Sequence, residues 1–138
     1  MRRKSGRGSE TVSNICQRRI IWTPVADKNG HNRYPRPVII LTPDAEMLSD
    51  PVYGVVASHT AWHLNPRPDH YIELPYHRQR MVMTRLSKPT VVICDWIVPV
   101  TQSAIADLTP DNIGGVVPPA IFEAILQKRA AMGRTSES

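Results

Sequence analysis

The stretch NRYPRPVIILTP, residues 32–43, places one arginine between two prolines, directly before an apolar run. Proline fixes its own φ and biases the residue before it away from the helical region. The backbone around Arg36 is therefore expected to be extended and stiff. The run VIIL that follows is continuously apolar, which is typical of a strand buried on both faces. The stretch predicts a strand over Pro37–Pro43 with the positively charged Arg36 at its start.

Further β-type runs are expected on both sides of this stretch, because β-branched and aromatic residues alternate with turn signals along most of the chain. The expected strands are 18–25, 37–43, 52–58, 71–75, 80–86 and 89–100, with a turn and short strand at 114–118. A helical turn is expected in 44–50 and a short helix in 102–108. PPAIFEAILQKRAAM, residues 118–132, has apolar residues at helical spacing and predicts the closing helix. This order predicts a mainly β fold, a small bent antiparallel sheet or barrel capped by a C-terminal helix.

Length and composition fit one compact domain, since the chain has 138 residues of which 41% are hydrophobic. No apolar stretch reaches the roughly 20 residues of a membrane span. The positively charged N-terminus has no apolar segment behind it, unlike a secretory signal. Cys16 and Cys94 make no disulfide framework and are expected to be reduced thiols. These observations predict a cytoplasmic protein with one domain over 15–132, a disordered basic tail over 1–14 and a flexible C-terminus over 133–138.

Positive charge is concentrated at the start of the sequence. The formal net charge is +5, and four of the 17 Lys and Arg residues lie within MRRKSGRGSE. This tail either contacts nucleic acid non-specifically or is simply solvated. No Lys or Arg occurs from Pro89 to Gln127, whereas several acidic residues do. We therefore expect one basic surface, which suits a polyanion, and one acidic or neutral surface.

An ordered set of segments carries a resemblance to a known family. IIWTPV, RPVIIL, VVASHT, VVICD and PAIFEAILQK follow one another at plausible spacing over residues 18–131. Together they resemble the MazF/PemK family of type II toxin–antitoxin toxins. The resemblance implies an SH3-like barrel that forms a homodimer and needs no cofactor or metal. It also implies an endoribonuclease that cleaves single-stranded RNA such as mRNA, and a cognate antitoxin that covers the active surface.

The resemblance also points to candidate catalytic residues. The Arg-Pro signature of the family falls on Arg36, its strand-end threonine on Thr60, a Cys-Asp pair of some members on Asp95, and a loop histidine on His31. RNA cleavage by the 2′-hydroxyl needs a proton acceptor and groups that stabilise the charged phosphorus. Arg36 and Thr60 suit the phosphate. Asp95 could orient Arg36, act as the base or be structural, and His31 could shuttle protons or have no role.

Four further residues are predicted to bind RNA, namely Arg33, Trp62, Arg67 and Arg78. Trp62 could stack on a base, cap the barrel or line a dimer interface. His59, His63 and His70 raise the question of a zinc site. The intervening NPRPD argues against a helix that would align these histidines, and no fourth ligand is indicated, so no metal is predicted.

The sequence departs from the family pattern at three places. Arginines are common in the family at two positions that are occupied here by Ile93 and by Val98 or Pro99. A small hydroxyl residue is common after Thr60, where this sequence has Ala61 and Trp62. These departures leave open a second hypothesis, a weakened or inactive barrel of the same fold that binds nucleic acid or a protein partner. A gyrase-directed toxin on a related fold is a third hypothesis.

Overall fold

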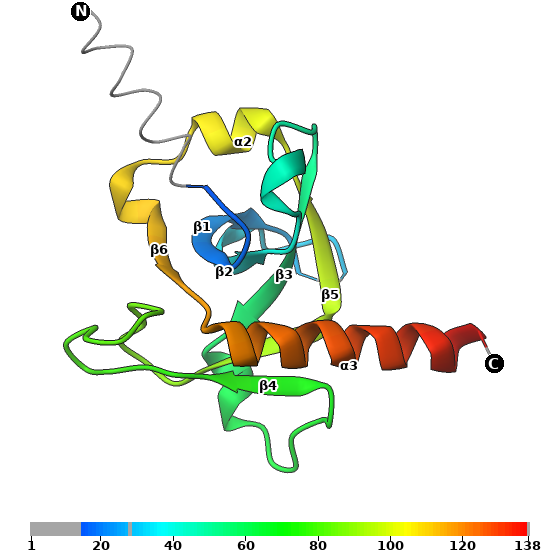
Figure 1. Ribbon diagram of the computed structural model, residues 1–138. Coiled ribbons are helices and arrows are strands. Elements are labelled where there is room, and N and C mark those ends of the chain that lie inside the picture. The colour runs from blue at the N-terminus through cyan, green and yellow to red at the C-terminus, as the bar shows by residue number, and fades with distance from the viewer. Residues whose placement is uncertain (1–14, 28, 138) are drawn as a thin grey trace, which may run out of the picture.

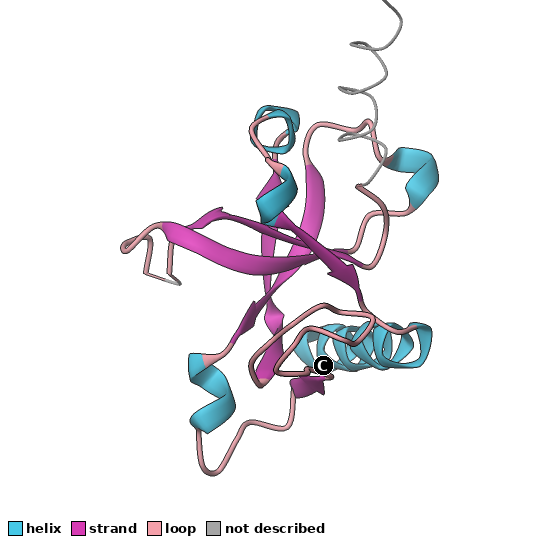
Figure 2. Ribbon diagram, turned by 90° about the vertical axis from the view of Figure 1, so that its left-hand side faces the viewer, coloured by secondary structure: helices cyan, strands magenta, loops and turns pink. Residues whose placement is uncertain are grey.

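A computed structural model describes residues 15–27 and 29–137, so the predicted basic tail over residues 1–14 lies outside the described residues. The described part forms one six-stranded sheet in which all neighbouring strands are antiparallel. The strands, in the order of the sheet, are β4 (Tyr71–Leu74), β5 (Thr90–Val100), β3 (Val52–Ser58), β2 (Tyr34–Ile40), β1 (Arg19–Val25) and β6 (Ile113–Val116). The sheet is strongly curled into a half-barrel, which Figure 2 shows as strands that cross one another. The predicted fold class is confirmed.

Short helical elements connect the strands. The 3-10 turns are η1 (Asp44–Glu46), η2 (Thr60–His63) and η3 (Pro110–Asn112), and the α-helices are α2 (Gln102–Ala106) and α3 (Pro119–Glu137). Helix α3 therefore continues past the predicted domain end at residue 132. None of the described helices is both long and apolar enough to cross a bilayer.

The sheet buries apolar side chains on both of its faces. Ile39 packs in the cluster that α3 covers with Phe122, while its neighbours Val38 and Ile40 pack in the cluster that includes Ile105 of α2. Successive side chains of a strand point to opposite faces, so a run of apolar residues feeds both clusters at once. The expected double burial of the VIIL run is thus observed for Val38, Ile39 and Ile40. Figure 1 shows α2 and α3 at opposite ends of the sheet.

Strand β2 begins three residues earlier than the sequence predicted and ends at Ile40 rather than Pro43. Its first half pairs only with β1, whereas β3 joins it from Val38 onward. Pro35 and Pro37 therefore lie where one side of the strand needs no ladder hydrogen bonds, a position in which proline is tolerated. The β1–β2 connection consequently shortens to residues 26–33.

The predicted strand over Arg80–Leu86 is wrong. This segment forms turns, because Arg80 and Arg85 adopt positive φ values of 62° and 58°. Left-handed residues interrupt the extended backbone that a strand requires. Thr84 and Leu86 are nevertheless buried, so the segment packs against the sheet as an ordered loop.

Candidate functional site

Arg36 lies near the start of β2, and its guanidinium is held by the end of β1 and by the loop that precedes β2. Nε donates a hydrogen bond to the Val25 carbonyl at 3.0 Å, and Nη2 donates to the Asn32 carbonyl at 3.2 Å. The guanidinium carbon lies 3.9 Å from the ring centre of Tyr34 and 5.2 Å from that of Trp96. Against the described residues, Arg36 uses two of its five N–H groups, so three are left for a ligand. A guanidinium held this way can give two parallel hydrogen bonds to a phosphate.

Asp27 organises the β1–β2 loop that holds Arg36. Its carboxylate accepts hydrogen bonds from the backbone N–H groups of His31 at 2.8 Å and Asn29 at 2.9 Å, and from the Asn32 side chain at 2.9 Å. These bonds, with that from His31 foremost, lower the pKa of Asp27 because they favour its charged form. The carbonyl of Asn32 accepts the hydrogen bond from Arg36 Nη2. The loop that Asp27 orders therefore also positions Arg36.

Arg36 and Thr60 line the same cavity, and their predicted role as ligands of one phosphate stays a prediction. This central cavity, of about 360 Å³, lies between β2, the end of β3 and the segment before β5, and it is also lined by His59, Arg80 and Lys88. A second cavity of about 680 Å³ also has Arg36 and Thr60 in its wall, together with Arg33. Strands β2 and β3 are antiparallel neighbours, so the start of one lies beside the end of the other. This pairing brings the two predicted phosphate ligands together.

His59 is a candidate that sequence reasoning considered only as a metal ligand. Its Nδ1 lies 2.5 Å from the carbonyl oxygen of Pro89. A carbonyl oxygen can only accept, so Nδ1 carries a proton, and in the neutral form of the ring Nε2 carries a lone pair. Its position next to Thr60 in the sequence was the available signal. Among the described residues, no three His, Cys, Asp or Glu side chains converge in a way that could hold a metal ion.

Asp95 and His31 lie apart from this arrangement. Neither cavity that joins Arg36 to Thr60 has Asp95 or His31 in its wall. Asp95 Oδ1 is 3.2 Å from Nε2 of His70. The residue after it, Trp96, is the one that approaches Arg36. The side chain of His31 is exposed. Catalytic assistance by Asp95 and His31 stays a prediction.

The residues predicted to bind RNA are spread over the surface. Arg33 lines the larger cavity with Arg36 and Thr60. Arg67 forms a 2.8 Å ion pair with Glu73, and its guanidinium carbon lies 5.5 Å from the ring centre of Trp62. Arg78 is exposed and lines neither cavity. The basic and aromatic residues of the central cavity that the sequence did not single out are Trp22, Tyr34, Arg80 and Lys88.

Solved structures of MazF share the architecture of this chain over most of its length. The chain has a MazF-like fold. MazF from Deinococcus radiodurans is similar at a TM-score of 0.60 and 15% identity, over 86% of this chain and 94% of that one. Two MazE–MazF structures from the same organism are similar at TM-scores of 0.58 and 0.53, with 13% and 16% identity, over 86% of this chain and 93% and 94% of theirs. No family model and no curated protein sequence matches the chain.

Proposed function

We propose that the protein is the toxin of a type II toxin–antitoxin pair and cleaves single-stranded RNA without a metal ion. The observation that carries the proposal is the convergence of Arg36, Thr60 and His59 on one cavity of a MazF-like fold. The 2′-hydroxyl attack on a phosphodiester needs charge stabilisation, which a guanidinium and a hydroxyl can supply, and a proton acceptor, which an imidazole can supply.

Arg36 and Thr60 hold the scissile phosphate. As the 2′-oxygen approaches phosphorus, negative charge grows on the non-bridging oxygens. The free N–H groups of Arg36 and the hydroxyl of Thr60 donate to these oxygens. Because the carbonyls of Val25 and Asn32 already fix the guanidinium, little reorganisation is needed when charge develops.

His59 takes the proton from the attacking 2′-hydroxyl on Nε2. The bond between the 2′-oxygen and phosphorus forms as the bond to the 5′-oxygen breaks, which gives a 2′,3′-cyclic phosphate. The leaving 5′-oxygen takes a proton from water, and the imidazolium returns its proton to solvent, so the overall reaction is balanced. The Pro89 carbonyl holds the Nδ1 proton and so keeps Nε2 available as the acceptor.

The test is incubation of the purified protein with single-stranded RNA in EDTA. We expect products with 2′,3′-cyclic phosphate ends, and a loss of roughly 10²- to 10³-fold in kcat for Arg36→Ala, as when a donor to a developing oxyanion is removed. Lys128→Ala, which removes a positive charge on α3 outside both cavities, is the control. Cleavage unchanged in Arg36→Ala would contradict the proposal. RNA binding with no cleavage by the wild type would support the non-catalytic alternative instead.

The proton acceptor is tested by replacing each candidate separately. His59→Gln keeps a side chain that can donate to the Pro89 carbonyl but removes the basic nitrogen. We expect this variant to lose the rise in rate with pH that a general base produces as it becomes deprotonated. Asp95→Asn and His31→Gln should keep that rise. If Asp95→Asn or His31→Gln abolishes it instead, the corresponding residue is the base.

Partners follow from the same proposal. Two of the similar solved structures are MazE–MazF complexes, which supports a small antitoxin protein as the partner of this chain. We also propose a homodimer, as the sequence resemblance implied. Light scattering of the purified protein measures the dimer. Co-expression with the product of a short neighbouring reading frame tests whether that product restores growth and inhibits cleavage.

A further inference from the structure

A side cavity of about 580 Å³ adjoins the central cavity. Arg85 and Asp111 line only the side cavity, whereas Trp22 and Arg80 line both. The other residues common to the two cavities are Pro35, Leu86 and Ser87. The two hollows are therefore adjoining parts of one groove, and Trp22 lies where they meet.

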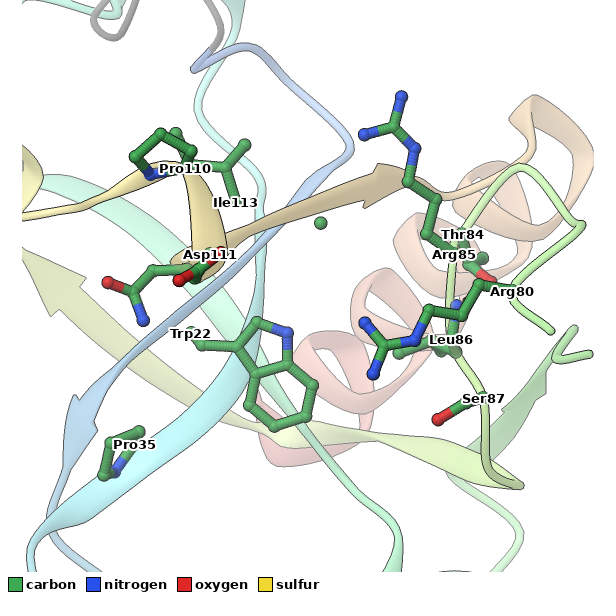
Figure 3. Close-up of a pocket in the computed structure, with 12 residues that line it drawn as sticks. Trp22, Pro35, Arg80, Thr84, Arg85, Leu86, Ser87, Pro110, Asp111 and Ile113 are labelled. Atoms are coloured by element: carbon green, nitrogen blue, oxygen red, sulfur yellow. The ribbon is translucent and has the colours of Figure 1, made fainter. Parts of the chain in front are cut away.

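The walls of the side cavity carry an aromatic face and two guanidinium groups. In Figure 3, Arg80 extends towards the indole of Trp22, Arg85 rises from the same loop, and Asp111 lies on the opposite side. The Trp22 side chain stays 36% exposed, although it lies on a central part of β1. An exposed indole beside cations is the combination with which proteins bind single-stranded nucleic acid, by stacking a base and pairing its phosphate. Asp111 repels a phosphate, which favours the arginine side for the backbone of the strand.

The loop that carries both arginines is firmly held. Thr84 donates through Oγ1 to the Pro75 carbonyl at 2.7 Å, and the Thr84 carbonyl accepts from Gly115 of β6 at 3.0 Å. Thr84 is fully buried, and Arg80 and Arg85 on either side of it have left-handed backbones. Bulky residues rarely adopt this conformation, and they keep it where the surrounding structure fixes it. The guanidinium groups therefore project from an ordered base, which lowers the entropy cost of binding.

We propose that the side cavity is a subsite for a nucleotide that flanks the scissile phosphate. The base of this nucleotide stacks on Trp22, and Arg80 and Arg85 bind the phosphate next to it. This inference rests on the proposed function, because Arg36 in the adjoining central cavity fixes the position of the scissile phosphate. It adds a second phosphate contact and a stacking platform to the cleavage site.

Substrates of different length distinguish the contributions of the two cavities to cleavage. A dinucleoside monophosphate has one phosphodiester and fills only the central cavity, whereas a single-stranded octanucleotide also reaches the side cavity. Arg85→Asn removes the guanidinium without new strain, because asparagine tolerates positive φ better than most residues. Lys128→Gln is the control, because it removes a positive charge on α3 that lines neither cavity.

We expect the wild type and Lys128→Gln to cleave the octanucleotide with a higher kcat/KM than the dinucleoside monophosphate. Arg85→Asn should lose about tenfold on the octanucleotide, as expected for one charged hydrogen bond, and should cleave the short substrate normally. Equal losses on both substrates, or equal octanucleotide rates for the two variants, would overturn the subsite.

Failure of the proposed function is recognised separately, because the wild type would then cleave neither substrate. In that case the subsite is tested by measuring the affinity for the octanucleotide in EDTA instead of the cleavage rate. A Kd raised about tenfold by Arg85→Asn, but not by Lys128→Gln, would still support the subsite. A Kd unchanged by Arg85→Asn would overturn it.

Discussion

Arg36 acquires its geometry from contacts on several sides rather than from its neighbours in sequence alone. Two carbonyls hold one edge of the guanidinium, and Tyr34 lies 3.9 Å from its central carbon. Stacking on an aromatic ring is worth roughly 1 kcal/mol at a partly exposed site. Tyr34 therefore acts as a positioning residue for the proposed phosphate ligand.

Tyr34→Leu should lower kcat about fivefold, because roughly 1 kcal/mol of stacking no longer holds Arg36 in place. Tyr53→Leu is a matched control, since Tyr53 is 49% exposed against 51% for Tyr34 and lines neither cavity that contains Arg36. Single-turnover cleavage of RNA and thermal unfolding measure the two effects separately. Equal rates for the two variants would show that Arg36 does not depend on Tyr34.

Cys94 carries a thiol that the core shields from solvent. Burial raises the pKa of its thiol to about 11, so the group is protonated and unreactive near neutral pH. Alkylation of the native protein with iodoacetamide at pH 8 should therefore spare Cys94, and denaturant should expose it. Cys16, which is only half-buried, is the internal comparison. Peptide mass mapping that finds Cys94 alkylated in the native protein would contradict this expectation.

The positions of individual site residues were predictable where they depend on where a strand begins or ends. Arg36 lies near the start of β2 and Thr60 two residues beyond the end of the neighbouring β3, so the family resemblance together with the predicted strands placed them near one another. Asp95 was harder, because the β3–β5 register shifts between Val55 and Ala57. Such an irregularity changes which face each side chain takes, so simple alternation along β5 does not tell where Asp95 points. His59 depended on a contact with the distant Pro89 carbonyl, which the sequence does not reveal.

At the scale of elements, the loop between β4 and β5 determines the shape of the groove. The sequence over residues 80–86 alternates as a strand does, but the left-handed backbone of Arg80 and Arg85 turns it into a loop. Backbone conformations of this kind depend on tertiary contacts, so composition does not disclose them. Here the contacts are hydrogen bonds from Gly115 and Val116 of β6 to the loop carbonyls, both at 3.0 Å.

Gly115→Ala should displace this loop and damage the groove. A Cβ at Gly115 would lie 1.9 Å from the Met83 carbonyl oxygen and 2.6 Å from the Thr84 carbonyl carbon, which is far closer than atoms can approach. We expect about 2 kcal/mol of lost stability, comparable to overpacking a core, together with weaker RNA binding.

Gly114→Ala is the matched control for this change. Its Cβ would lie 3.2 Å from the nearest atom, the Ile20 carbonyl oxygen, which a small adjustment relieves. Urea unfolding of both variants measures the difference in stability. Equal unfolding midpoints would show that the backbone of β6 does not fix the loop.

For the molecule as a whole, the fold class was predictable and the arrangement of charge was not. The alternation of apolar and turn residues was sufficient for a curled antiparallel sheet with a closing helix. The strand order β4-β5-β3-β2-β1-β6 depends on long-range pairing that local patterns do not encode. The separation of basic and acidic segments along the sequence is also lost in part, because Asp111 from the acidic segment lines the same cavity as Arg80 and Arg85.

The remaining positive charge of the groove should appear in the salt dependence of RNA binding. Each phosphate that a cation neutralises on a single strand contributes about −0.7 to the slope of log K against log salt concentration. Lys88 lines the central cavity with an exposed side chain, whereas Lys128 lies on α3. Lys88→Gln should therefore flatten the slope by about 0.7, and Lys128→Gln should leave it parallel to that of the wild type. Fluorescence anisotropy of a labelled single strand between low and physiological salt gives both slopes. Equal slopes for the wild type and both variants would mean that RNA does not enter the groove at Lys88. A smaller slope for Lys128→Gln alone would indicate that RNA binds on the face covered by α3 instead.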